Sequence, residues 1–278
     1  MGMKLACGHW GQGSMPLMLI HGFTGSRASW DHLRPLMGSE VKALAVDLPG
    51  HGESEPCSLS GEKGFAQTIA ALRRAMDEFD AGPISILGYS QGARLALALA
   101  IESPDRVRRV ILESGTAGLI RSRDRTMRRA SDEALARQIE VDGIASFVGR
   151  WQSLPLFTGV RKLPAELADS VKAGRLACSA RGLASSLRSV GLGIQPNYWP
   201  MLPVLRVPTL LLTGRRDAKF TGIARAMARE IPRAWLRSFD NAWHAPHLEA
   251  AAPFASEVLS FVGASLLEAP LFDSEATA

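Results

Sequence analysis

Ser90 is the centre of the sequence GYSQG (88–92), which lies between an apolar run at 84–87 and a helical pattern that begins near Ala93. A G-x-S-x-G pattern between a strand and a helix predicts a nucleophile elbow, a turn too tight for side chains on its flanks. Such a turn lifts the serine hydroxyl above the edge of a sheet. Because a serine hydroxyl is inert at neutral pH without a base, the chain must also supply one.

The base and its supporting acid are expected further along the chain, in the order serine, acid, histidine. Asp217 and His244 each directly follow a predicted strand. Both therefore lie at carboxyl ends of strands, where α/β sheets bind their ligands. We predict that His244 is the base of Ser90 and that Asp217 fixes its tautomer and stabilises its cation. His247 is an alternative base, and Asp240 is a weaker alternative acid.

A negative charge that develops beside Ser90 would need preorganised amide donors. The sequence HGFTG (21–25) ends the first predicted strand, where this arrangement commonly supplies one such amide, and the residue after the serine supplies the other. We therefore predict that the backbone N–H groups of Phe23 and Gln91 form an oxyanion hole. The sequence DLPGHGES (47–54) is interpreted as scaffold rather than chemistry.

The elements that must position these residues alternate in type along both ends of the chain. Apolar runs predict strands, and apolar residues spaced by three and four predict helices. Strands are expected at 16–20, 41–46, 83–88, 107–112, 207–213 and 234–239, and helices at 65–79, 91–102, 222–230 and 253–266. This alternation predicts an α/β protein with a mostly parallel central sheet flanked by helices. Together with the elbow, it indicates the α/β-hydrolase fold.

Residues 118–195 interrupt the alternation and contain no convincing strand. Helix-like stretches are expected at about 122–142, 143–151, 164–177 and 179–190. We predict a core domain made of residues 1–117 and 196–266, with an all-helical cap inserted at 118–195. The short polar tail at 267–278 is predicted to be disordered.

Composition argues against several other classes of protein. No apolar run is long enough to span a membrane, and the first residues lack the apolar stretch of a secretory signal, so a cytoplasmic protein is expected. The three cysteines and six histidines form no disulfide framework or metal-ligand set, so neither metal nor cofactor is expected. The net charge of +5 comes without a nucleic-acid motif and fits a basic surface or a polyanionic small substrate. We expect no nucleic-acid partner, no membrane insertion, and a monomer or weak homo-oligomer.

Further motifs resemble one family from about residue 16 to residue 262. They include YSQGAR (89–94), RRASD (128–132), LPLF (154–157) and GRRDAKF (214–220). The family is the menaquinone-pathway 2-succinyl-6-hydroxy-2,4-cyclohexadiene-1-carboxylate (SHCHC) synthases. The resemblance implies a carbon–oxygen lyase that eliminates pyruvate from 2-succinyl-5-enolpyruvyl-6-hydroxy-3-cyclohexene-1-carboxylate. Ser90 would then act as a base through His244 and form no acyl-enzyme. The alternative is a serine hydrolase of esters or carbon–carbon bonds that uses the same triad.

The implied substrate carries three carboxylates, and arginine binds carboxylates through two parallel hydrogen bonds. Arg94 lies one helical turn after Ser90 and so shares its side of the helix. The resemblance assigns substrate contacts to Tyr89, Arg94, Arg128, Trp151 and Arg175, and more weakly to Gln195 and Lys219. These side chains also have purely structural interpretations. Arg94 could form a salt bridge that ties its helix to a neighbour, and Arg128 and Arg175 could be solvated surface residues. Trp151 could belong to the cap core.

The chain departs from the usual pattern of the family at two positions. Ala93 follows the elbow where the family usually has glycine, close to tight packing between helix and strand. Trp243 precedes the histidine where the family again usually has glycine. A large side chain there could narrow the pocket or shift the loop.

Overall fold

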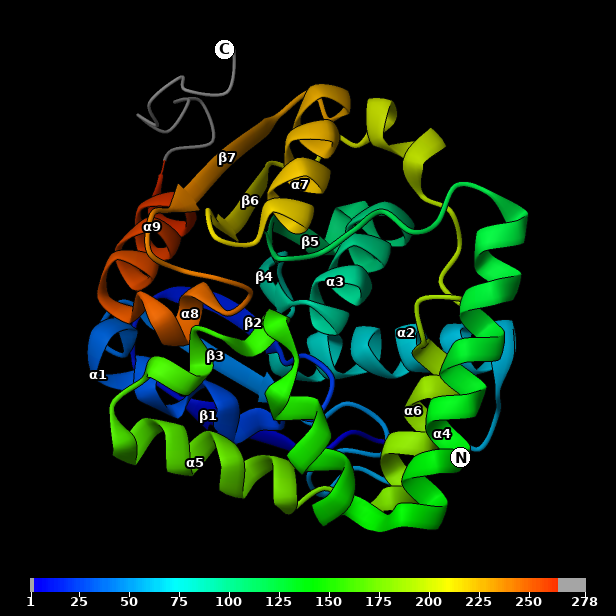
Figure 1. The fold of residues 1–278 in the computed structure, drawn as a ribbon. Coiled ribbons are helices and arrows are strands. Elements are labelled where there is room, and N and C mark those ends of the chain that lie inside the picture. Colours follow the sequence, from blue (N-terminus) through cyan, green and yellow to red (C-terminus); the bar gives the residue numbers. More distant parts are fainter. Residues whose placement is uncertain (1–2, 265–278) are drawn as a thin grey trace.

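The protein is described by a computed structural model over residues 3–264, which is built around one seven-stranded sheet (Figure 1). The strands lie in the order β1-β3-β2-β4-β5-β6-β7. β1 runs antiparallel to β3, and all other neighbours are parallel. Their bounds are β1 Cys7–Trp10, β2 Met15–Ile20, β3 Val41–Val46, β4 Ile84–Tyr89, β5 Val107–Glu113, β6 Thr209–Gly214 and β7 Ala234–Phe239. The predicted mostly parallel sheet is confirmed, and β1 is a strand that the sequence analysis did not predict.

Helices cover both faces of the sheet, as its apolar strands require. Successive side chains of β2 point to opposite faces: Leu17 and Leu19 join one core cluster, and Met18 and Ile20 join the other. The cluster that holds Met18 and Ile20 is closed by α2 (Gly61–Phe79), α3 (Gln91–Glu102) and α7 (Ala218–Glu230). The opposite cluster is closed by the 3₁₀ helix η1 (Arg27–Leu33), α1 (Arg34–Met37) and α9 (Ala251–Gly263). The remaining short elements of the core are η2 (Pro104–Arg106), η5 (Trp199–Val204) and α8 (Pro246–Glu249).

The segment 118–195 contributes helices and, in the described part of the chain, no strand. They are α4 (Ser122–Ser153), η3 (Pro155–Phe157), η4 (Val160–Lys162), α5 (Ala165–Leu176) and α6 (Ala180–Val190). Gly143 interrupts α4 with φ 77° and ψ 170°, at the position where the sequence predicts a break. The cap has a small core of its own, which includes Ile139, Phe147 and Leu183. In Figure 1 these green to yellow-green helices border the core domain from α8 to α2.

Helix α7 begins four residues before the predicted start at 222, and a side-chain cap explains the difference. Asp217 is the N-cap residue, and its Oδ1 accepts the backbone N–H of Phe220 at 3.2 Å. The same carboxylate is the predicted acid, so capping and positioning are combined in one residue. The predicted tail at 267–278 lies outside the described residues. Among the described helices, none combines the length and the apolarity that crossing a bilayer requires.

The backbone of the cap lies against the backbone of the core where α6 meets the loop after β3. A Cβ atom at Gly182 would collide with the carbonyl oxygen of Gly50, and one at Gly50, which has φ 78°, would collide with the backbone of Gly182. Two glycines facing each other therefore allow backbone to lie against backbone.

Replacing Gly182 with alanine should separate these two backbones. We expect Gly182→Ala to lower the free energy of unfolding by about 1–3 kcal/mol, the usual cost of overpacking, as measured by urea denaturation. Gly149→Ala is the matched control, because Gly149 lies inside α4 with open space around its Cβ position. That change should instead stabilise the protein by roughly 0.5–1 kcal/mol. Equal effects of the two changes would contradict the close approach.

Candidate active site

Ser90 occupies the sharp turn between β4 and α3, with φ 52° and ψ −104°. Its backbone N–H donates to the carbonyl of Glu113 on β5 at 2.8 Å, which anchors the turn to the sheet. A Cβ at Gly88 would collide with the backbone of Gly92, and one at Gly92 would collide with the carbonyl of Ile20. The two glycines are therefore steric requirements of the turn, as the elbow pattern predicts.

His244 lies between Ser90 and Asp217. Its Nε2 is 3.1 Å from Ser90 Oγ, and its Nδ1 is 2.7 Å from Asp217 Oδ2. His244 and Asp217 are buried. An ionised carboxylate can only accept, so the Nδ1 carries the proton and the Nε2 lone pair faces the serine hydroxyl. This is the geometry of a hydroxyl activated by a histidine base.

The alternative base and acid lie elsewhere. The Nδ1 of His247 is 2.8 Å from the buried Oε1 of Glu113 and pairs with it rather than with Ser90. Burial lowers the pKa of His247 to about 3 and raises the pKa of Glu113 to about 8. Asp240 pairs with Arg215 at 2.7 Å on the surface. The geometry thus favours His244 and Asp217.

Phe23 follows β2, and Gln91 is the first residue of α3, so their backbone amides come from two loops that meet at the serine. In residues 3–264 neither N–H group donates to a protein acceptor. The side chain of Gln91 is occupied by a 3.0 Å bond to Ser186 Oγ on α6. The ring of Phe23 packs edge-on against Phe147 and Trp151 of the cap. The arrangement is compatible with the predicted oxyanion hole.

Two buried histidines hold the loop that carries Phe23, a role that the sequence does not predict. The Nε2 of His21 accepts the backbone N–H of Leu48 at 3.0 Å, and the Nε2 of His51 accepts that of Thr24 at 3.3 Å. Each ring donates through Nδ1 to a nearby backbone carbonyl. Burial lowers the pKa of His21 to about 4 and that of His51 to about 3. The loop at 47–54 is thus a support for the loop at 21–25.

A cavity of about 400 Å³ opens beside Ser90 and His244, between the core and the cap. Most of the residues predicted to contact substrate line it, namely Tyr89, Arg94, Arg128, Trp151, Arg175 and Lys219. Phe220 also lines it, with its ring 4.5 Å from that of His244, and was not predicted. Within the motif at 214–220, the sequence assigns roles only to Asp217 and Lys219.

Gln195 differs from its prediction because it does not line the cavity. It is fully buried, its Nε2 donates to the carbonyl of Thr116 at 3.1 Å, and its Oε1 accepts from Arg94 Nη1 at 3.3 Å. Arg94 also donates to the carbonyl of Val190 at 3.0 Å. Gln195 therefore supports the guanidinium of Arg94 from behind. Burial first, and then the charge of Arg128, lower the pKa of Arg94 to about 10, so it remains a cation at neutral pH.

The cavity holds polar atoms that have no protein partner. Arg128 uses its Nε to bind Asp132 Oδ1 at 2.7 Å, on the adjacent turn of α4. Among the described residues, the buried cavity-lining atoms without a hydrogen bond are Ser114 Oγ, Asp132 Oδ2, Trp151 Nε1 and Arg175 Nη1. Buried polar groups are normally satisfied in a folded protein. Their presence in one cavity indicates that a polar ligand completes it.

The two departures from the family pattern do not obstruct this cavity. The methyl group of Ala93 faces Gly115, where an added Cβ would come within 2.7 Å of it, so the missing side chain at 115 makes room. The ring of Trp243 lies outside the cavity, under the ammonium of Lys162 at 4.6 Å and near the guanidinium of Arg216 at 6.0 Å. The expectation that Trp243 could narrow the pocket is therefore wrong. In the described chain no group of three or more histidine, cysteine or acidic side chains is arranged to hold a metal ion.

Comparison with known proteins places this geometry in a family. The model of the alpha/beta hydrolase family matches residues 17–257. A protein of Bacillus subtilis (strain 168), named as a candidate SHCHC synthase, is 32% identical over 90% of both chains. The SHCHC synthase of Salmonella paratyphi A is 30% identical, over 85% of this chain and 89% of the relative. The solved structure of MenH from S. aureus is 31% identical with a TM-score of 0.87, over 94% of this chain and 98% of the other.

The buried histidines predict how stability depends on pH. Folded His21 and His51 stay neutral down to about pH 4 and 3, whereas unfolded histidines take up protons below about 6.5. The unfolded state therefore binds more protons as the pH falls, and stability is lost in that direction. For these two residues we expect the free energy of unfolding to fall by up to about 3 kcal/mol per pH unit between pH 6.5 and 4.

Urea denaturation at a series of pH values measures this slope. His51→Gln should reduce the slope by the contribution of one proton, roughly 1.4 kcal/mol per pH unit. The glutamine amide oxygen can still accept the Thr24 N–H but does not titrate. His9→Gln, at an exposed position, is the control and should leave the slope unaltered. An unchanged slope in the His51 variant would show that His51 is not held neutral.

Proposed function

The chain belongs to the alpha/beta hydrolase family and, within it, to the SHCHC synthases, and from this premise we propose that it eliminates pyruvate from 2-succinyl-5-enolpyruvyl-6-hydroxy-3-cyclohexene-1-carboxylate. The product of this lyase reaction is SHCHC, an intermediate of menaquinone biosynthesis. We propose the same roles for the site residues as the sequence predicts, except that Gln195 positions Arg94.

The observation that carries the proposal is the combination of an activated serine with three arginines in one cavity. Arg94, Arg128 and Arg175 surround the space beside Ser90, and Arg94 and Arg175 are buried. A buried cation without a counter-charge is costly, so the site favours an anionic ligand. A tricarboxylate matches this charge, and the unpartnered N–H groups of Trp151 and Arg175 add donors for its oxygens. A neutral ester would leave these donors unused.

The triad then acts as a base. His244 takes the proton of Ser90, and the Ser90 oxygen removes the ring proton next to the succinyl ketone, while Asp217 stabilises the imidazolium. The ketone oxygen becomes an oxyanion that the amides of Phe23 and Gln91 would stabilise. As the electron pair returns through the ring, the carbon–oxygen bond to the enolpyruvyl group breaks. The released enolpyruvate gains a proton on its terminal carbon and becomes pyruvate, which balances the proton lost from the ring.

Pyruvate release separates this proposal from the hydrolase alternative. With the enolpyruvyl substrate, we expect steady release of pyruvate, which is measured by coupling the reaction to lactate dehydrogenase. Ser90→Ala should lower kcat by about 10²–10⁴, the usual contribution of a positioned base. Turnover of a short-chain nitrophenyl ester is the matching assay for the hydrolase. Ester turnover with a burst, together with no pyruvate release, would contradict the lyase and support the hydrolase.

Neighbouring arginines on α4 offer a matched test of the substrate's charge. Arg128 lines the cavity, whereas Arg129 does not and instead donates to the carbonyl of Gly193 at 2.7 Å. A hydrogen bond to a charged group contributes about 1.5–3 kcal/mol, so Arg128→Ala should lower kcat/KM roughly tenfold or more. Arg129→Ala removes the same charge one residue away and should leave kcat/KM near the wild-type value. Similar losses in both variants would mean that only overall charge matters.

A further inference from the structure

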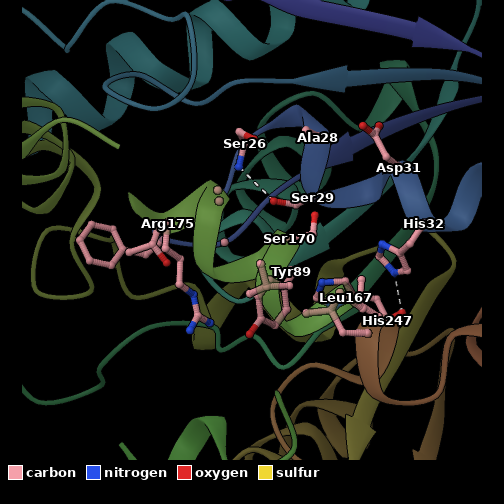
Figure 2. Close-up of a pocket in the computed structure, with 17 residues that line it drawn as sticks. Ser26, Ala28, Ser29, Asp31, His32, Tyr89, Leu167, Ser170, Arg175 and His247 are labelled. Carbon is pink, nitrogen blue, oxygen red and sulfur yellow. Dashed lines mark hydrogen bonds between the residues drawn. The ribbon is translucent and has the colours of Figure 1, made fainter. Parts of the chain in front are cut away.

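A second cavity, of about 180 Å³, adjoins the catalytic one at Tyr89, which lines both; Figure 2 shows this second cavity. Its floor comes from the core, from the loop and 3₁₀ helix at 22–32 and from His247 and Leu248 in α8. Its roof comes from the cap helix α5. No step of the proposed reaction uses this space, although Phe23, Tyr89 and Arg175 line both cavities and form the wall between them.

One face of α5 runs along the cavity from solvent to that wall. The residues that line it, spaced as one side of a helix, are Leu167, Ser170, Val171, Gly174 and Arg175. Ser170 and Gly174 are exposed, Leu167 and Val171 are half-buried, and Arg175 is buried. The cavity therefore leads from the protein surface to the edge of the catalytic site.

Arg175 makes the inner end of this cavity suitable for an anion. It is only 7% exposed, its guanidinium lies 4.4 Å over the ring of Phe157, and its Nη1 has no hydrogen-bond partner in the described chain. In Figure 2 its guanidinium lies next to the hydroxyl end of Tyr89. Burial raises the pKa of Tyr89 well above its ordinary value, so its hydroxyl keeps its proton and can donate. Two donors thus converge where the cavities meet.

The three arginines of the site fall into two groups. Arg128 is close enough to Arg94 for its charge to lower the Arg94 pKa, and these two line only the larger cavity, whereas Arg175 lines both. The titratable neighbours of Arg175 are Tyr89 and Cys178 instead. Elimination would divide one tricarboxylate into a ring dicarboxylate and a small monocarboxylate, which repel each other. A separate cation at the boundary can hold the small fragment while Arg94 and Arg128 hold the large one.

We propose that this second cavity is the binding and exit site of the small 2-oxo acid released by the elimination, an inference that rests on the proposed function. The carboxylate of the acid binds Arg175 and Tyr89. Its methyl group lies among the apolar side chains of Leu167, Val171 and Leu248. The acid then leaves past Ser170, so the ring product need not move first.

Binding of pyruvate can be measured without turnover, from the broadening of its methyl proton resonance in the presence of the protein. Ser170→Asp places a negative charge in the passage and should weaken pyruvate binding several-fold. Ala173→Asp is the matched control, because Ala173 is exposed on the same helix and does not line the cavity. It should bind pyruvate as the wild type does. Pyruvamide, which lacks the charge, should bind weakly to all three proteins.

The outcomes separate this inference from the proposed function. Pyruvate binding that Ser170→Asp leaves unchanged, or that both variants weaken equally, overturns the exit site even if the enzyme releases pyruvate from its substrate. If Ser170→Asp alone weakens pyruvate binding but the wild type releases no pyruvate from the enolpyruvyl substrate, the exit site is supported and the lyase is contradicted. Succinate is the competing ligand, since the succinyl arm of the substrate also ends in a carboxylate. If Ser170→Asp weakens the binding of succinate more than the binding of pyruvate, the cavity holds the succinyl arm and the exit site is wrong.

Discussion

The turn at Ser90 is the constraint on which the rest of the site depends. A non-glycine residue at φ 52° and ψ −104° costs about 1–3 kcal/mol and persists only when its surroundings fix it. Here the surrounding backbone packs so closely on the two flanking positions that only glycine fits, and the carbonyl of Glu113 accepts the Ser90 N–H. The turn places the hydroxyl above the sheet edge, the Gln91 amide at the start of α3, and Arg94 one turn further on. The serine hydroxyl, the proposed oxyanion donor and the arginine are thus positioned at the start of one helix.

The site holds charge that the fold alone does not neutralise. On the cap surface, Arg188 binds Glu133 and Glu140 at 2.8 and 2.6 Å, an arrangement that contributes little because it is solvated. Arg94, in contrast, is buried against neutral carbonyl and amide oxygens, and among the described residues no carboxylate pairs with it. Stability is therefore lower than an apolar or paired side chain would give. Binding of an anion recovers that energy, which is a direct physical reason for affinity and selectivity.

Much of the fold and site could be predicted because local signals were strong. The strands, the break at Gly143 and the elbow all follow from short patterns, and the chain order of serine, acid and histidine selects Asp217 and His244. Contacts between distant residues carried no such signal. Nothing local shows that Gln195 lies behind Arg94, or that His21 and His51 accept backbone N–H groups from loops 27 residues away. Strand β1 is short and only half-buried, so its pattern is weak.

The position of His244, the proposed base, also depends on the cap, through Glu249. Its half-buried carboxylate accepts the backbone N–H groups of Trp243 and Ala245, the two residues that flank His244. Gly159 of the cap packs so closely on this carboxylate that a Cβ there would collide with it. Lys162 lies over the ring of Trp243 from the same cap segment. A shift of this segment would therefore change the support of His244 without touching the substrate. Trp243, which does not line the cavity, adds to the contact through which the cap and His244 are coupled.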